Sequence, residues 1–221
     1  MIGPERKTIP LSVLDIRHLT PSAYVLRIDR GTLEFRAGQY ISLGIYPGRE
    51  MREYSIYSGE QDDYLEVFIR EVEQGSVSRQ LKQLSAGKRI HMAGPFGFFT
   101  LSPEIIRDKN ILMVASGTGI APFHSFTRSY PGLNYRIIHG VRYGNESYER
   151  ESYDQERYIL CTSRDGSGHF HGRVTSYLEQ NPIQIETDFY LCGNRNMVHD
   201  MYDLLTGQGI MQGNIHAEIY F

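Results

Sequence analysis

The sequence lacks the features that mark metal-cluster, disulfide-rich and membrane proteins. It has no tryptophan and only two cysteines, Cys161 and Cys192, with no Cys-x-x-Cys pair. Two isolated thiols are too few for an iron–sulfur cluster held by the chain alone. There is also no run of about 18 apolar residues, which is roughly what a membrane-spanning helix needs.

Charge and the N-terminal segment exclude further classes. The formal net charge is −3, and the basic residues are scattered along the chain, which argues against a nucleic-acid partner. Residues 1–7 are not followed by an apolar segment of the kind found in secretory signals. Because both cysteines lie in or at the end of apolar runs, reduced thiols are expected. We expect a monomeric protein of a reducing cytoplasm, without membrane insertion.

The chain of 221 residues is long enough for two modest domains, which we place at 1–102 and 103–221. In the first, strands are predicted at residues 12–20, 23–28, 40–45, 52–58, 64–70 and 89–93, with one helix at 77–84. Short strands separated by turn residues predict an antiparallel β-barrel. Pro103 and the charged residues 107–110 mark the expected junction.

The second domain alternates between strands and helices. Strands are predicted at residues 110–115, 135–140, 157–162, 188–192 and 216–220, and helices at 122–129, 172–179 and 196–205. This alternation predicts an α/β domain with a doubly wound parallel sheet. Ligands of such sheets bind at the carboxyl ends of the strands.

Two motifs of the first domain carry groups that suit a flavin dinucleotide. Arg52–Ser55 places an arginine, a tyrosine and a serine along one strand. These offer a cation for a pyrophosphate, a ring for stacking and a hydrogen-bond donor. Residues 75–78, Gly-Ser-Val-Ser, open the predicted helix, whose free N–H groups can receive phosphate oxygens. Ser78 could instead be a plain helix N-cap.

A third motif follows the apolar strand at 110–115. Residues 116–122 read Ser-Gly-Thr-Gly-Ile-Ala-Pro, a glycine turn between a buried strand and a helix. Such a turn brings backbone N–H groups to a dinucleotide phosphate. Pro122 stands where the usual fingerprint has its third glycine, and it suits the first helical turn because it has no N–H to satisfy.

In this order the motifs resemble those of the ferredoxin–NADP reductase superfamily. Cys192-Gly193, followed by Met197, and residues 217–221, Ala-Glu-Ile-Tyr-Phe, bring the chain close to the bacterial ferredoxin (flavodoxin)–NADP reductases. The resemblance runs from about Gly38 to the last residue. It implies an FAD-dependent oxidoreductase that passes electrons between NADPH and ferredoxin or flavodoxin, by hydride transfer to flavin N5.

The resemblance also implies a flavin-binding set. Arg52 and the turn at 75–78 would contact the FAD pyrophosphate, Tyr54 would cover one ring face, and Ser55 would hydrogen-bond near N5. The strand at 64–70 would run along the ring, although it is equally well explained as an ordinary barrel strand. The implied set comprises Arg52, Tyr54, Ser55, Phe68, Ile69, Arg70, Gly75, Ser76, Val77 and Ser78.

Three arginines bear on the choice of pyridine nucleotide. Arg142 and Arg164 follow successive strands of the second domain, and Arg173 opens the next helix. By the resemblance, they and Ser163 hold the NADP 2′-phosphate, which favours NADPH over NADH. The alternative is that they are surface arginines paired with Asp165 or Glu151. The implied NADP set comprises Gly117, Thr118, Gly119, Arg142, Ser163, Arg164, Arg173, Cys192 and Gly193.

The catalytic set implied by the resemblance is Ser55, Cys192, Glu218 and Tyr220. Cys192 would lie beside the nicotinamide C4, and Glu218 would orient the nicotinamide or exchange protons with N5 through Ser55. Tyr220 would cover the second flavin face and move aside for the nicotinamide, with Phe221 near the adenine. Cys192 as a small apolar residue and the aromatic tail as a core plug are the alternatives.

Two rival functions stay open. One is an NADH-specific reductase module of the same fold that serves an oxygenase or another partner, and the arginine set counts against it. The other is a non-catalytic binding protein on this fold, against which the presence of Ser55, Cys192 and Tyr220 counts. His169 and His171 have no third and fourth ligand nearby, so no metal site is expected.

Overall fold

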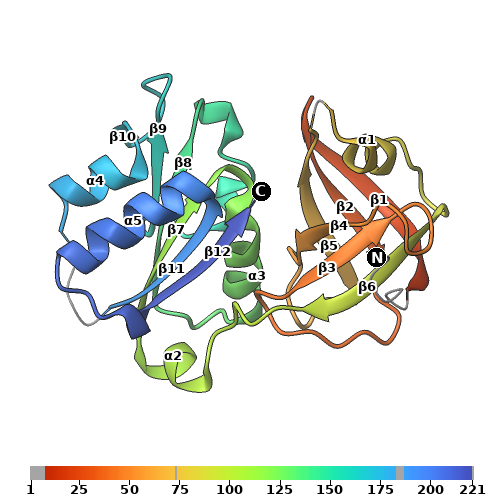
Figure 1. Cartoon of the computed structure of the whole chain (residues 1–221), viewed down its shortest axis with the longest axis horizontal. Helices are drawn as coiled ribbons and strands as arrows, with labels where there is room; N and C mark the ends of the chain where they lie inside the picture. Colours follow the sequence, from red (N-terminus) through yellow and green to blue (C-terminus); the bar gives the residue numbers. More distant parts are fainter. Residues whose placement is uncertain (1–7, 73, 183–186, 221) are drawn as a thin grey trace, which may run out of the picture. The chain divides into compact units, whose positions relative to one another are not determined.

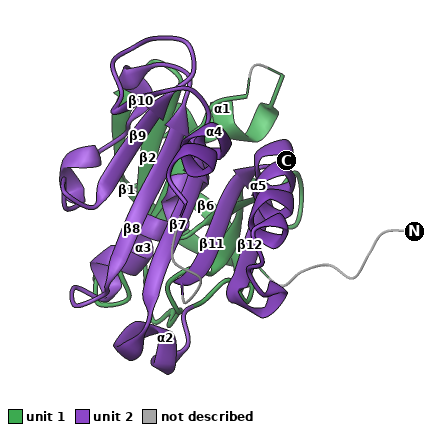
Figure 2. Cartoon of the chain, turned by 90° about the vertical axis from the view of Figure 1, so that its left-hand side faces the viewer, with its two compact units in different colours: residues 1–100 green, residues 101–221 purple. Residues whose placement is uncertain are grey.

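The structure is a computed structural model that describes residues 8–72, 74–182 and 187–220. The chain divides into two compact units, residues 1–100 and 101–221 (Figure 2). Within the described residues, no helix is long and apolar enough to cross a membrane.

The described residues of unit 1 form an antiparallel barrel with helix α1 beside it (Figure 1). Its sheet has the order β4-β3-β6-β1-β2-β5. An antiparallel bridge between Ile56 and Val67 links the strands at its two edges, so the sheet closes on itself and leaves few unpaired groups. The predicted barrel is therefore confirmed. Its elements are β1 (Ile9–Thr20), β2 (Ala23–Asp29), β3 (Tyr40–Gly44), β4 (Arg52–Ser55), β5 (Tyr64–Arg70), α1 (Ser76–Lys82) and β6 (Arg89–Phe96).

Strand β4 ends at Ser55, earlier than predicted, because the next residues pair with two different partners. The N–H of Ile56 donates to the Gln39 carbonyl at 2.9 Å, and that of Tyr57 donates to the Glu66 carbonyl at 2.7 Å. The chain thus crosses from one edge of the barrel to the other directly after the Arg52–Ser55 motif.

Unit 2 is a six-stranded parallel sheet with helices on both faces (Figures 1 and 2). The strand order is β10-β9-β8-β7-β11-β12, so the chain runs outward from β7 and then returns to its other side. The predicted doubly wound sheet is confirmed. Its elements are α2 (Pro103–Asp108), β7 (Asn110–Ser116), η1 (Gly117–Ile120), α3 (Ala121–Ser129), β8 (Tyr135–Val141), η2 (Gly144–Glu146), η3 (Arg150–Ser152), β9 (Tyr158–Thr162), β10 (Phe170–His171), α4 (Val174–Gln180), β11 (Thr187–Asn194), α5 (Arg195–Gly207), η4 (Gln212–Asn214) and β12 (Ile215–Tyr220).

Alternate residues of the central strands pack on opposite faces of this sheet. Val114 of β7 and Leu191 of β11 belong to a core shared with α4 and α5. On the other face, Phe126 of α3 packs edge-on against Tyr190, with ring centroids 5.7 Å apart. Burial on both faces explains why β7 and β11 read as continuous apolar runs.

Besides the short 3₁₀ segments, helix α2 and strand β10 were not predicted. Helix α2 lies where a junction was expected: Ser102 accepts a hydrogen bond from the Ile105 N–H at 3.3 Å, and Pro103 opens the helix. Strand β10 is a two-residue pairing of Phe170 and His171 with β9, too short to show in a sequence pattern.

Candidate nucleotide-binding sites

The carboxyl ends of β7 and β11 meet where the strand order reverses. The Asn194 N–H donates to Ser116 Oγ at 2.9 Å. Gly193 has a φ of +135°, and a Cβ there would overlap Ser116. A Cβ at Gly119 would overlap the backbone of Cys192. Close backbone approach therefore requires glycine at both positions, and it packs the glycine turn against the end of β11.

The glycine turn itself forms the 3₁₀ segment η1, with Gly117 at a φ of +53°. Helix α3 begins at Ala121, with Pro122 in its first turn as the sequence suggested. The turn and α3 are thus one unit leaving the central strand at its carboxyl end, the place where open α/β sheets bind their ligands.

Backbone hydrogen bonds bring the loops that carry the three arginines together. The Arg164 N–H donates to the Arg142 carbonyl at 2.9 Å, and the Gly172 N–H, next to Arg173, donates to the Thr162 carbonyl at 2.9 Å. All three arginines and Ser163 are exposed. Among the described residues no ion pair joins any of the three guanidinium groups to a carboxylate, including those of Asp165 and Glu151. The Arg164 guanidinium lies over the Tyr143 ring, 5.9 Å from its centroid.

The nearby carboxylates are bound to backbone instead. Glu146 Oε2 accepts the Arg142 N–H at 2.9 Å. Asp165 accepts the Gly144 N–H at 3.0 Å and the Ser167 hydroxyl at 2.8 Å. These bonds, the one from Gly144 first, lower the pKa of Asp165. Sequence reasoning missed this role, since Asp165 was considered only as a partner for arginine.

A cavity of about 440 Å³ lies beside these loops, within the size range of small-molecule sites. It is lined by Tyr143, Gly144, Asn145, Arg150, Leu160, Asp165 and Ser167.

Three of the four predicted catalytic residues come together in unit 2. Glu218 lies opposite Cys192 in the β11–β12 pairing, and Tyr220 lies opposite Asn194. Burial raises the pKa of the Cys192 thiol, the charge of Glu218 raises it further, and a hydrogen bond with the Tyr220 side chain opposes them. The thiol is therefore neutral. Phe221 lies outside the described residues.

In unit 1, the residues of the Arg52–Ser55 motif differ in exposure. Arg52 is exposed, and its guanidinium donates to the Met51 carbonyl at 3.0 Å and has no acidic partner among the described residues. Tyr54 is half-buried, and burial raises its pKa to about 12 against the opposing charge of Arg52. Ser55 is buried and pairs with Tyr40. A guanidinium that no carboxylate neutralises among the described residues, beside a half-exposed ring, suits an anionic aromatic ligand.

The two predicted flavin motifs lie close together. Burial raises the pKa of the Tyr24 hydroxyl, nearby Tyr54 raises it further, and this hydroxyl donates to the Ser78 carbonyl in α1. The Ser76 hydroxyl donates to Glu50 Oε2 at 3.0 Å, two residues before Arg52. The motifs are 20 or more residues apart in sequence, and the barrel brings them to one place.

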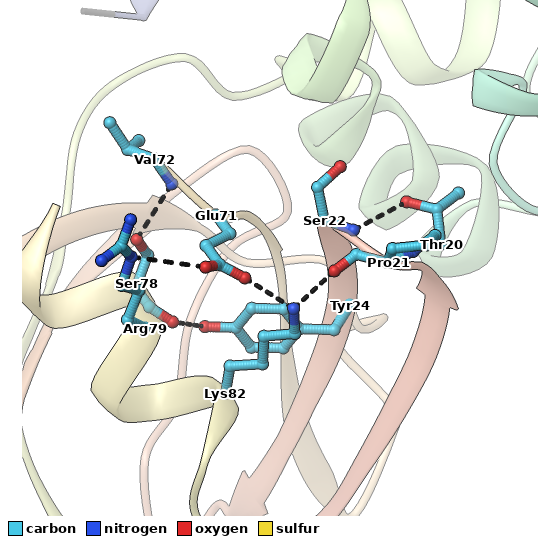
Figure 3. Close-up of polar contacts among 9 residues, drawn as sticks. All are labelled: Thr20, Pro21, Ser22, Tyr24, Glu71, Val72, Ser78, Arg79 and Lys82. Carbon is cyan, nitrogen blue, oxygen red and sulfur yellow. Dashed lines mark hydrogen bonds and ion pairs between the residues drawn. The ribbon is translucent and has the colours of Figure 1, made fainter. Parts of the chain in front are cut away.

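A set of polar contacts holds α1 on the barrel (Figure 3). Glu71 binds Lys82 at 2.6 Å and Arg79 at 3.4 Å, and the hydrogen bond from Lys82 lowers the Glu71 pKa. Ser78 Oγ accepts the Val72 N–H at 3.2 Å, so this hydroxyl ties the preceding loop to the helix. The start of α1, Gly75 to Ser78, is thereby held in position.

The remaining flavin candidates lie on β5. Phe68 and Ile69 are buried and pair with Val25 and Tyr24 of β2. Ile69 packs in the barrel core, so only its backbone could face a ligand. His169 of unit 2 has a structural contact, since its Nδ1 accepts the Leu160 N–H at 2.9 Å. No group of three or more potential ligands is placed to hold a metal within the described residues.

Comparison with known proteins agrees with this architecture. Residues 17–101 match an oxidoreductase FAD-binding domain, and residues 113–203 match an oxidoreductase NAD-binding domain. A flavodoxin/ferredoxin–NADP reductase from Buchnera aphidicola is 27 % identical and covers 95 % of each chain. The electron transfer component of toluate 1,2-dioxygenase from Pseudomonas putida is 29 % identical, and the match covers 94 % of this chain but 66 % of that protein.

A crystal structure of a ferredoxin NADP+ reductase from Neisseria gonorrhoeae, with bound FAD and NADP, superposes with a TM-score of 0.87 at 27 % identity. The match covers 98 % of this chain and 100 % of that one. An FAD-binding barrel followed by an NAD(P)-binding doubly wound domain is thus present here, and the chain belongs to the ferredoxin–NADP reductase superfamily.

Proposed function

We propose that the protein oxidises NADPH through FAD and delivers the electrons to a one-electron protein carrier, ferredoxin or flavodoxin. The observation that carries the nucleotide choice is the arrangement of Arg142, Arg164 and Arg173. Their exposed guanidinium groups have no acidic partner among the described residues, while Glu146 and Asp165 are bound to backbone N–H groups. Such a set favours a dianionic phosphate, and with NADH bound the three guanidinium charges would have no phosphate to neutralise them.

The residues of unit 1 fit a flavin that carries a pyrophosphate. Arg52 supplies an exposed guanidinium with no acidic partner among the described residues, and Gly75 caps the start of α1 without a side chain over its N–H groups. Tyr54 supplies a ring for stacking and Ser55 a hydroxyl. We assign Phe68, Ile69 and Arg70 to the same site through their backbone.

When bound, FAD supplies the hydride acceptor and the means to release two electrons singly. The protein contributes position rather than acid–base chemistry. Gly117, Thr118, Gly119 and Gly193 let the dinucleotide approach the backbone. The neutral thiol of Cys192 shapes the nicotinamide site, and Glu218 orients the nicotinamide ring. Tyr220 moves aside when the nicotinamide binds.

The test is a steady-state assay of NADPH and of NADH oxidation with an artificial electron acceptor, on the wild type and two variants. Arg164→Ala removes one charge-assisted bond to the 2′-phosphate, worth about 1.5–3 kcal/mol. Its KM for NADPH should rise about ten- to a hundredfold, and its KM for NADH should stay the same.

Arg107→Ala is the matched control. Arg107 is an exposed arginine of unit 2 that pairs with Asp108 at 2.9 Å, so this variant makes the same charge change away from the proposed site. It should alter neither KM. Equal losses for both nucleotides in Arg164→Ala would mean that Arg164 is structural and that the proposal is wrong.

The similarity to the dioxygenase component favours a second candidate, an NADH-dependent reductase for an oxygenase. Faster flavin reduction by NADH than by NADPH, with no effect of Arg164→Ala on either, would support that candidate instead.

A further inference from the structure

One imidazole is buried in the middle of the parallel sheet, next to the glycine turn. His139 of β8 has no exposed surface and pairs with Ala115 of β7 and Leu160 of β9. Its Nε2 lies 2.8 Å from the Gly117 carbonyl oxygen, and its Nδ1 lies 2.6 Å from the Tyr158 hydroxyl. A buried polar ring is costly unless both nitrogens are bonded, and here both are.

The two partners determine which nitrogen carries the proton. The Gly117 carbonyl can only accept, so the Nε2 of His139 must be the donor. In a neutral ring Nδ1 then accepts from the Tyr158 hydroxyl. Burial lowers the pKa of His139 to about 4, so the ring is neutral at physiological pH. The imidazole is thus a fixed donor directed at the first residue of the turn.

The same ring belongs to a larger aromatic cluster on this face of the sheet. Tyr158 stacks on Tyr153 with centroids 5.4 Å apart, and Tyr153 meets the His124 ring edge-on at 5.9 Å. His124 belongs to α3, the helix that the turn opens. This cluster therefore contacts the glycine turn at Gly117 through His139 and includes His124 of helix α3. Its members are His124, His139, Tyr153 and Tyr158.

The turn tolerates little displacement, because a Cβ at Gly119 would already overlap the backbone of Cys192. We infer that His139 is a positioning residue for pyridine-nucleotide binding, which holds the Gly117 carbonyl so that the glycine turn fits the part of the dinucleotide shared by NADPH and NADH. This rests on the proposed function only in that the turn binds a pyridine nucleotide.

Variants of His139 and of Arg164 should differ in which nucleotide's KM they change. Arg164 acts on the 2′-phosphate alone, whereas His139 should affect both nucleotides by the same factor. His139→Leu should raise KM for NADPH and for NADH by about tenfold each, the loss expected for one buried hydrogen bond. The flavin reduction rate at saturating nucleotide should change less than KM.

Ile137→Ala is the matched control for simple destabilisation. Ile137 is buried on the same strand, two residues from His139, and it makes no hydrogen bond to the turn with its side chain. It should lower the melting temperature and leave both KM values unchanged. If His139→Leu does not fold, His139→Gln carries the test: its amide can still donate, and both KM values should rise by one shared factor below tenfold.

A long-range ¹H–¹⁵N spectrum of the imidazole nitrogens of the holoprotein reports the tautomer and the protonation state of His139, which a purely packing role would not fix. It should show His139 as the neutral Nε2–H tautomer at pH 6. The inference is overturned if His139 variants affect NADPH alone, if Ile137→Ala raises KM as much as they do, or if His139 is protonated at pH 6. A preference for NADH would refute the proposed function, but the His139 variants should still raise both KM values by the same factor.

Discussion

Acidification should destabilise unit 2 through His139. The unperturbed pKa of histidine is about 6.5, and burial lowers that of His139 to about 4 in the folded protein. Between these values the unfolded chain binds a proton that the folded chain does not. The stability linked to the neutral ring is therefore fully present above pH 6.5 and falls as the pH falls toward 4.

The size of the effect follows from the two pKa values. A difference of about 2.5 pKa units corresponds to about 3.4 kcal/mol once both states are protonated, and to about 2.5 kcal/mol at pH 4.5. Desolvation is the main cause, opposed by the Gly117 hydrogen bond and by the charge of Glu146. Tyr158, the other polar neighbour, stays protonated throughout, because burial raises its pKa. Because the charge of Glu146 raises the His139 pKa, Glu146→Gln should lower that pKa further and slightly enlarge the loss of stability on acidification.

Native-state amide hydrogen exchange in β8 and β9 measures the local opening free energy of unit 2 at each pH, and it does not require the two units to unfold together. From pH 7 to pH 4.5 the opening free energy of these strands should fall by about 2.5 kcal/mol more in the wild type than in His139→Leu. Equal losses in the two proteins would refute the reasoning, since the imidazole would then bind its proton equally well in both states.

Three further results are expected. Heat should release FAD from the purified protein, because Arg52 and the turn at 75–78 together suit a pyrophosphate; chromatographic recovery of FMN alone would reject that assignment. Asp165→Asn should loosen the joined loops and raise KM for NADPH by about tenfold, with NADH unchanged; tighter NADPH binding would show that charge repulsion outweighs positioning. Tyr220→Ser should shift discrimination toward NADH in stopped-flow flavin reduction, and unchanged kinetics and charge-transfer absorbance would exclude a gating role.

The order of elements and the identity of the motifs could be read from the sequence. Period-two strands before residue 103, strand–helix alternation after it, and the glycine turn at 116–122 are local signals, since each depends on residues within one element. The barrel and the doubly wound sheet follow from these patterns. The positions of Arg142, Arg164 and Arg173 at strand and helix ends were visible for the same reason.

Only the tertiary structure decided which groups those residues meet. Three hydrogen-bonded pairs join residues that are far apart in the sequence: Gly117 and His139 are 22 residues apart, Gly144 and Asp165 are 21 apart, and Tyr24 and Ser78 are 54 apart. Such pairs depend on strand register and on loop geometry, neither of which leaves a periodic trace in the sequence. For that reason Asp165 reads as a surface carboxylate and His139 as one polar residue in an apolar strand, until the fold places each against the backbone that it holds.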